Sequence, residues 1–318
     1  MMPLKKNSKI YLAGHTGLVG SAILKELKDQ GYTNILTKSH KELDLLHSED
    51  VVNFLQKEKP EYIILAAAKA GGIIANSTYP AEFIYENLQI QNNIIHNSYL
   101  NNVKKLVFLG SSCIYPRNCP QPIKEEYLLT GELEPTNEPY AISKIAGVKM
   151  CDSYNKQYGT HFICVMPTNI YGINAGFHPD KSHVIPGLIN RIHSAKVKNL
   201  PSASIWGTGK AKREFLYSQD LANACVYLLE NYSGNEILNI GTGKDLTIKE
   251  LAEMICDVIE YKGNLLFDST KPDGTPRKLL DISKLTKLGW KAKTNLKDGL
   301  IKTYNWYLKN IAKLPIHK

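Results

Sequence analysis

The sequence predicts an α/β fold: a Rossmann-like, doubly wound parallel sheet with a smaller C-terminal subdomain. A short apolar strand at 9–13 leads into a glycine-rich turn and an amphipathic helix. Short strand patterns then alternate with helical ones as far as Met166. From about residue 171 this alternation gives way to segments that read as loops and helices rich in polar groups. These three observations predict that the N-terminal part of the chain forms the sheet and that the C-terminal part forms the smaller subdomain.

The composition indicates which classes of molecule the protein can be expected to bind. The 318 residues are 43% hydrophobic and 22% charged, which is ordinary for a soluble globular protein. The formal charge of +9 comes from scattered lysines, so it favours anionic small molecules over nucleic acid, which selects a dense basic stripe. We expect no membrane segment, because the apolar run 63–68 is too short to span a bilayer. The six cysteines show no metal-ligand spacing, so we expect no metal site and a cytoplasmic enzyme with reduced thiols.

The first strand is followed by the motif GxxGxxG and then by a helix, which is the order that a dinucleotide site needs. The first glycine permits a tight turn, the second lets backbone approach a pyrophosphate, and the third lets helix pack on strand. The helix N-terminus offers N–H groups to phosphates. A plain strand-to-helix turn is the alternative. The predicted cofactor contacts here are Gly14, His15, Thr16, Gly17, Leu18, Val19 and Gly20.

The second strand, at 35–37, ends in Lys38, Ser39 and His40. An acidic residue at this point usually holds the ribose 2′-hydroxyl of NAD, whereas basic residues accommodate the 2′-phosphate of NADP. Lys38, and with it His40, therefore favours NADP(H). Asp44 and Leu45 follow shortly afterwards and are expected to line the adenine pocket.

Polar residues follow the later strands of the predicted sheet. Strand patterns at 60–68 and 103–110 flank a long helix at 80–100, and the second of these strands runs into Ser111. A further strand at 162–166 ends in Pro167. Ligands of open α/β sheets lie outside the carboxyl ends of the strands, so we place the active site at this edge.

Tyr140 and Lys144 are spaced one helical turn apart. If Tyr140 starts a helix, as Pro139 before it suggests, both side chains leave the same face. A phenol with a pKa near 10 is a poor acid unless a nearby cation favours its ionised form, and Lys144 supplies that cation. Taken alone, the pair reads more readily as a helix-surface coincidence.

The C-terminal half divides between the two units. The run 236–241 has the pattern of a strand that returns to the sheet, and helices are expected at 248–260 and 296–309. We therefore assign 1–170 and about 214–243 to a dinucleotide-binding domain. The segments 171–213 and 244–318 are assigned to a substrate-binding subdomain.

The glycine motif, the strand-end Ser111 and the Tyr140–Lys144 pair occur in an order that resembles the extended short-chain dehydrogenase/reductases. Longer stretches are similar to the GDP-L-fucose synthase family and cover nearly the whole chain. These stretches are 67–73, 110–116, 134–142, 182–186, 206–207 with 213–216, and 271–278.

The resemblance implies an NADPH-dependent reaction on a GDP-4-keto-6-deoxy sugar, with 3,5-epimerisation followed by reduction at carbon 4. It places Cys113 and His183 as the acid–base pair of epimerisation. Tyr140 is then the proton donor of the reduction, Ser111 hydrogen-bonds the same oxygen, and Lys144 lowers the tyrosine pKa and holds the nicotinamide ribose.

The resemblance also implies the remaining contacts. Further cofactor contacts are Leu109, Gly110, Ser111, Ser112, Lys144, Pro167, Thr168, Asn169, Ile170 and His183. The GDP-sugar is held by Asn169, Arg191, Trp206, Arg213 and Asp273. A homodimer formed through two helices per subunit is expected.

The chain departs from the family at several positions. Thr16 stands where members often have Arg, Tyr217–Asp220 reads Tyr-Ser-Gln-Asp in place of His-Val-Asp-Asp, and the loop 173–176 differs. These changes leave the sugar open, a heptose included. The alternatives are a GDP-keto-sugar 4-reductase without epimerase activity, a nucleotide-sugar 4-epimerase that retains NAD, and a non-catalytic dinucleotide sensor.

Overall fold

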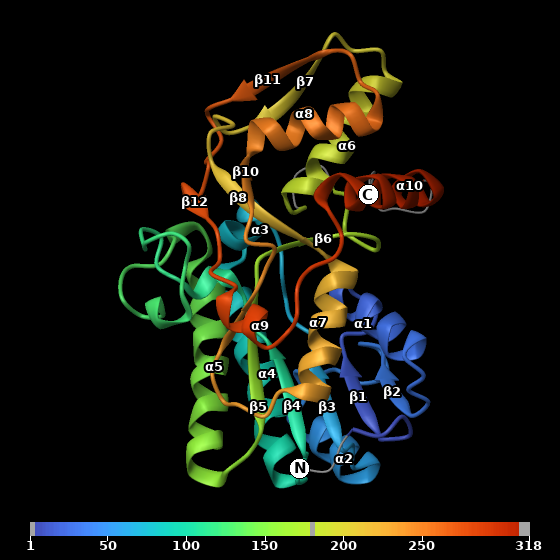
Figure 1. The fold of residues 1–318 in the computed structure, drawn as a ribbon, viewed down its shortest axis with the longest axis vertical. Helices are drawn as coiled ribbons and strands as arrows, with labels where there is room; N and C mark the ends of the chain where they lie inside the picture. Colours follow the sequence, from blue (N-terminus) through green and yellow to red (C-terminus); the bar gives the residue numbers. More distant parts are fainter. Residues whose placement is uncertain (1–3, 179–181, 312–318) are drawn as a thin grey trace.

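A computed structural model describes residues 4–178 and 182–311. Its main element is a six-stranded parallel sheet with the strand order β2-β1-β3-β4-β5-β9 (Figure 1). The strands are β1 (Ile10–Ala13), β2 (Ile35–Lys38), β3 (Tyr62–Leu65), β4 (Lys105–Leu109), β5 (Phe162–Pro167) and β9 (Leu238–Ile240). The chain passes from β1 to β2 on one side and then to β3 on the other, so a switch point lies between β1 and β3. A ligand is expected at the carboxyl ends of these two strands.

Helices cover both faces of this sheet. On one face lie α2 (Ser48–Glu58), α4 (Pro80–Leu100) and α5 (Glu138–Tyr158), and on the other lie α1 (Leu18–Asp29) and α7 (Ser218–Asn231) (Figure 1). Alternate strand residues enter the two cores: Ile63 joins the first and Ile64 the second. The predicted fold class is confirmed, and the long helix predicted at 80–100 is α4.

The smaller unit contains more strands than the sequence predicted. β8 (Lys212–Tyr217) pairs with β10 (Asp245–Thr247), β12 (Arg277–Lys278) and β6 (Asn169–Tyr171), while β7 (Ser202–Trp206) pairs with β11 (Asn264–Asp268). The prediction of loops and helices for the smaller unit missed these strands, because they are short and several of their positions are half or fully exposed. The strand predicted at 236–241 is β9 and does return to the large sheet.

Helices α6 (Val184–Val197), α8 (Ile248–Ile259) and α10 (Leu296–Asn310) surround a third core in the smaller unit. The short helices are α3 (Ile73–Thr78), α9 (Ser283–Lys287), η1 (Ser112–Ile114), η2 (Glu125–Tyr127) and η3 (Pro135–Asn137). The predicted domain boundaries stay predictions. Two features bear on them: β8 crosses the boundary expected at 214, and Leu285 of α9 and Trp290 pack in the core of the large sheet.

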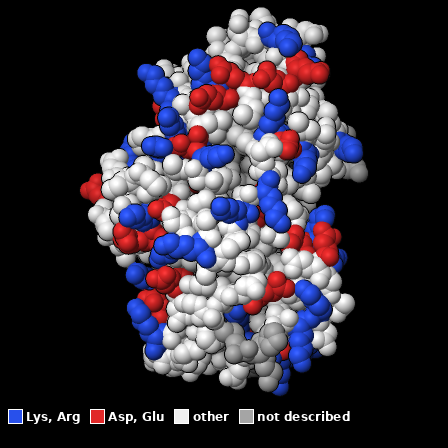
Figure 2. Space-filling view, in the orientation of Figure 1, with Lys and Arg blue, Asp and Glu red and all other residues white. Residues whose placement is uncertain are grey.

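Within the part of the chain that the structure describes, no helix is both long and apolar enough to cross a membrane. On the face shown in Figure 2, basic and acidic side chains are interspersed.

Candidate active site

A cleft of about 610 Å³ opens between the carboxyl edge of the large sheet and the smaller unit. It brings together most of the predicted site residues: Gly17, Leu18, Val19, Gly20, Leu109, Gly110, Ser111, Ser112, Cys113, Tyr140, Lys144, Pro167, Thr168, Asn169, Ile170, His183, Arg191, Trp206, Arg213 and Asp273. Six predicted cofactor residues do not line it, namely Gly14, His15, Thr16, Lys38, Asp44 and Leu45. The first three of these lie in the turn behind the cleft, and the others lie at and after the end of β2.

The glycine turn has the geometry that a dinucleotide needs. Gly14 has φ of 85°, and a Cβ there would lie 2.6 Å from the Ala67 nitrogen. A Cβ on Gly20 would lie 2.0 Å from the Gly14 carbonyl oxygen, so α1 packs directly on the turn. Gly17 precedes α1 without a side-chain cap, and the first turn of α1 holds no acidic residue. The N–H groups of this helix end are therefore open to an anion.

Charged side chains lie near the end of β2. The Lys38 ammonium pairs with Glu42 at 3.7 Å, and the His40 ring nitrogen lies 3.6 Å from the Asp44 carboxylate. Leu45 is buried in the core below α2 and α4. Positive charge thus accompanies negative charge at the position where the cofactor ribose is expected.

Tyr140 and Lys144 lie in the first two turns of α5, which begins at Glu138. The Lys144 Nζ lies 5.9 Å from the centroid of the Tyr140 ring and donates to the Leu109 carbonyl oxygen at 2.9 Å. Burial lowers the pKa of Lys144 to about 8. Burial also raises the pKa of Tyr140, the charge of Cys113 raises it further, and a hydrogen bond with Ser111 acts the other way. The expected lowering of the tyrosine pKa was therefore wrong, because desolvation outweighs it.

Cys113 is the middle residue of the short helix η1 (Ser112–Ile114), and three polar groups lie close to it. Its Sγ lies 3.2 Å from the Asn137 amide nitrogen and 3.5 Å from the Lys278 Nζ, and its backbone N–H donates to the Ser111 Oγ at 3.2 Å. Burial by itself raises the thiol pKa, but Lys278 and the hydrogen bonds outweigh it, so that the pKa lies below its ordinary value. This environment favours a thiolate.

His183 directly precedes α6 and lines the same cleft. The residue as a whole is exposed, but the protein around the imidazole desolvates its charged form and lowers the pKa of His183. The imidazole is therefore held toward its neutral form.

Four of the five predicted substrate residues form two contact pairs, and Asn169 contacts Glu214. The Arg191 guanidinium lies over the Trp206 ring, 4.6 Å from its centroid. Arg213 donates to the Asp273 carbonyl oxygen at 2.9 Å, and the Asp273 carboxylate accepts from Thr208 at 2.7 and 2.8 Å. The Asn169 amide donates to the Glu214 carbonyl oxygen at 2.8 Å. The roles of all these residues in binding and catalysis remain predictions.

The sequence reasoning missed three residues that shape the site: Asn137, Glu214 and Lys278. All three stand inside stretches on which the family resemblance rests, but no spacing rule gave them a role. Glu214 is fully buried and ties the smaller sheet to neighbouring loops, since its carboxylate accepts from three backbone N–H groups.

Among the described residues, no cluster of three His, Cys, Asp or Glu side chains could hold a metal ion.

Comparison with known proteins finds relatives along nearly the whole chain. Residues 10–241 match the model of the NAD dependent epimerase/dehydratase family. The chain is 59% identical to GDP-L-fucose synthase 1 of Arabidopsis thaliana, over 96% of this chain and 95% of the relative. It is 50% identical to GDP-L-fucose synthase of Escherichia coli, over 95% and 97%. A solved structure titled GDP-mannoheptose C4 reductase from Campylobacter jejuni with NADP bound is 43% identical, with a TM-score of 0.88, over 96% and 99%.

Proposed function

We propose that this chain, which belongs to the NAD dependent epimerase/dehydratase family, is an NADPH-dependent GDP-sugar epimerase/reductase. Its reaction is the 3,5-epimerisation and 4-reduction of a GDP-4-keto-6-deoxy sugar, giving GDP-L-fucose or a close analogue. The observation that carries the proposal is that Cys113, His183, Tyr140 and Lys144 all line one cleft. The two GDP-L-fucose synthases that it resembles at 50% and 59% identity support the same reaction.

Epimerisation needs a base and an acid on opposite sides of the sugar, because the carbon-4 ketone acidifies the hydrogens on carbons 3 and 5. The Cys113 thiolate takes the proton and becomes a thiol, and the electron pair of the broken C–H bond moves into the enolate. His183, as a neutral imidazole in the same cleft, passes a solvent proton to the carbon: one ring nitrogen releases its proton while the other accepts one from solvent. The Cys113 thiol then returns its proton to solvent. The lowered pKa of Cys113 suits it to the first step.

Reduction needs a proton at the carbon-4 oxygen when hydride arrives. NADPH supplies that hydride when bound. Tyr140 stays protonated, because burial raises its pKa, so it can donate to the developing alkoxide, and Ser111 hydrogen-bonds the same oxygen. Lys144, anchored on the Leu109 carbonyl, orients the nicotinamide ribose.

The residues fit such a dinucleotide. The open N-terminus of α1 suits the pyrophosphate, and the Gly14–Gly20 contact leaves no room for side chains there. Lys38 favours a 2′-phosphate, although its Glu42 partner and Thr16 weaken the preference over NAD. NADP is bound in the solved Campylobacter jejuni relative, which supports the assignment.

The test offers purified protein a panel of GDP-4-keto sugars with NADPH or NADH in D₂O. We expect oxidation of NADPH only with the correct sugar, and deuterium at carbons 3 and 5 even when NADPH is omitted. Cys113→Ser should slow this exchange far more than it slows reduction of an already epimerised ketone. If all the sugars leave NADPH unoxidised, the proposed function is wrong.

A GDP-keto-heptose 4-reductase without epimerase activity is the second candidate. It is supported by the similarity to the GDP-mannoheptose C4 reductase and by the altered loop 173–176. Reduction of a heptose substrate without any deuterium at carbons 3 and 5 would select this function over the first.

We also propose a homodimer in which α4 and α5 meet the same helices of a second subunit. These two long helices pack together and expose Tyr85, Leu100 and Tyr158 on their outer side. Light scattering after gel filtration should give twice the chain mass, and Tyr85→Glu should shift the equilibrium toward the monomer.

The cytoplasm is the proposed compartment, because Cys113 and the other five cysteines are free thiols.

A further inference from the structure

The residue that contacts Cys113 from the smaller unit is Lys278, and the two lie 165 positions apart in the sequence. Lys278 is largely buried and belongs to β12, a strand of only two residues. A free lysine side chain has many rotamers, so a fixed contact with a thiol requires that the backbone of β12 be held in place. What holds it therefore decides whether the contact is persistent.

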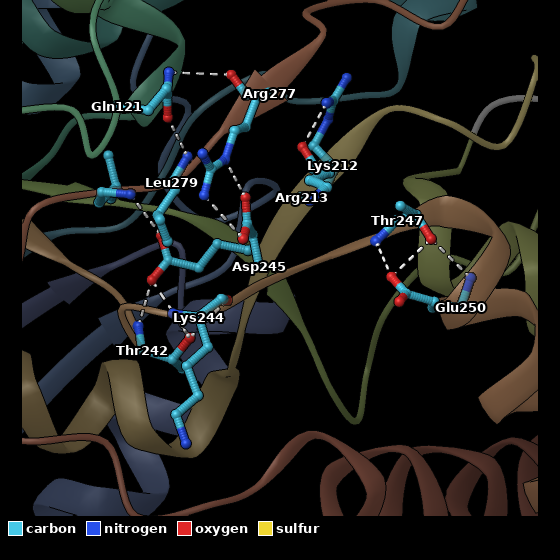
Figure 3. A network of polar contacts seen from close by, with 12 residues as sticks. Gln121, Lys212, Arg213, Thr242, Lys244, Asp245, Thr247, Glu250, Arg277 and Leu279 are labelled. Carbon is cyan, nitrogen blue, oxygen red and sulfur yellow. Dashed lines mark hydrogen bonds and ion pairs between the residues drawn. The ribbon is translucent and has the colours of Figure 1, made fainter.

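The side chain of Gln121 forms hydrogen bonds with the backbone on both sides of Lys278 (Figure 3). Its amide nitrogen donates to the Arg277 carbonyl oxygen at 3.2 Å, and its amide oxygen accepts from the Leu279 N–H at 2.9 Å. A side-chain amide thus makes the two bonds that a neighbouring strand makes. Arg277 is itself held by a two-point ion pair with Asp245 of β10 (Figure 3).

Hydrogen bonds also hold the backbone of residues 279–281, which follow Lys278. The Ile123 N–H donates to the Leu279 carbonyl at 2.7 Å, and the Asp281 N–H donates to the Ile123 carbonyl at 2.8 Å. The Leu280 N–H donates to the Glu214 carboxylate at 2.9 Å. The segment that carries Lys278 is therefore bonded to the 121–123 loop, which follows Cys113 closely in the sequence.

We infer that Gln121 and Lys278 are positioning residues that hold Cys113 as a thiolate, Gln121 by fixing the backbone of β12 and Lys278 by placing its ammonium beside the sulfur. Asn137 completes the arrangement, because its amide N–H also donates to the sulfur, at 3.2 Å. The importance of this thiolate for epimerisation rests on the proposed function, whereas the thiolate itself does not. A role of Lys278 in substrate binding alone is the competing explanation.

The other ionisable groups around Cys113 do not replace this cation. Tyr140 of α5 faces the sulfur as a neutral phenol, and Arg213 of β8 interacts with it electrostatically but donates to backbone carbonyls and is also coupled to Asp273. His183 lines the same cleft. Among these ionisable groups, Lys278 is the one whose side chain donates a hydrogen bond to the sulfur, at 3.5 Å.

The test measures ionisation of the thiol directly, without substrate. Carbamidomethylation of Cys113 is followed between pH 6 and 10 by mass spectrometry. Trypsin releases Cys113 in the peptide 106–117 and Cys256 in the peptide 250–262. Burial, Asp257 and Glu253 raise the pKa of Cys256, and Lys278 is not among these causes, so Cys256 serves as an internal reference. We expect Lys278→Met to raise the midpoint for Cys113 by about 1–3 pH units and Lys278→Arg to keep it near the parent value. Lys212→Gln removes one charge from the adjacent exposed strand position and should leave the midpoint unchanged.

Gln121→Ala removes the two hydrogen bonds to the backbone of Arg277 and Leu279 without changing the charge. It should raise the midpoint in the same direction but by less, whereas Gln30→Ala, which removes an amide bonded to Glu26 far from the cleft, should not. Circular dichroism shows whether Lys278→Met and Gln121→Ala fold. If one of them does not, the Cys113 midpoint of the other tests the inference. An unchanged Cys113 midpoint in folded Lys278→Met or Gln121→Ala overturns the inference, even if the KM for the GDP-sugar rises. A shifted midpoint in an enzyme that shows no deuterium exchange would support the thiolate and reject the epimerase.

Discussion

Glu214→Gln should destabilise the junction between the two units. The carboxylate is fully buried, and its oxygens accept from the backbone N–H groups of Thr242 at 2.5 Å, Gly243 at 2.7 Å and Leu280 at 2.9 Å. The first two bonds use one oxygen and the third uses the other. An amide offers only one acceptor oxygen, so at least one buried N–H loses its partner and the others face a neutral group.

Leaving one buried donor unpaired costs about 1–3 kcal/mol, and weakening the remaining bonds brings the expected loss to about 2–4 kcal/mol. At about 2.1 cal/mol/K per residue, the unfolding entropy of a 318-residue chain converts this loss to about 3–6 °C in Tm. Urea titration and calorimetry measure both quantities. Glu253→Gln, in an exposed pair with Lys249, should stay within about 0.5 kcal/mol of the parent. A loss for Glu214→Gln no larger than that of this control would refute the reasoning.

Four further outcomes follow from the cleft. Tyr140→Phe should abolish reduction yet leave cofactor binding intact by fluorescence titration; retained turnover would show that another group donates the proton. Gly20→Ala places a Cβ 2.0 Å from the Gly14 oxygen, so it should weaken NADPH binding by at least about 100-fold in calorimetry, and unchanged affinity would contradict the close packing. Lys38→Met should reduce the preference for NADPH over NADH by about tenfold in kcat/KM, and no change would place the 2′-phosphate elsewhere. Because the pKa of Cys113 lies below its ordinary value of 9.0, the exchange rate should rise with pH as the thiolate forms and level off at a midpoint below 9.0; a midpoint above 9.0 would argue against the thiolate base.

The large sheet was predictable because its signals are local. The 14–20 turn and the long periodic helix at 80–100 each have a pattern within one stretch of chain, and β9 is an apolar run with clear ends. The strands of the smaller unit lack such signals. β12 has two residues, and β11 alternates around half-exposed positions, so each exists through its pairing with β8 or β7 rather than through its own pattern.

Several of the predicted site residues lie together because the strands of a parallel sheet end at one edge. Ser111 and Cys113 follow β4, and the residues after β5 lie beside them, so the positions in the sequence already implied proximity. Lys278 and Gln121 had no such signal. Their partners lie 165 and 158 positions away, and a contact across that separation exists only when two units have packed together.

The effect of burial on the two reactive groups could not be anticipated from the sequence either. Desolvation raises the pKa of Tyr140 and by itself raises that of Cys113, but Lys278 and its neighbours reverse the second shift. Groups whose environments move their pKa values apart divide into an acid and a base at one pH. The negative charge of Cys113 is also one of the causes that keep Tyr140 protonated. In the proposed mechanism, the base of epimerisation therefore also helps to keep the proton donor of reduction protonated.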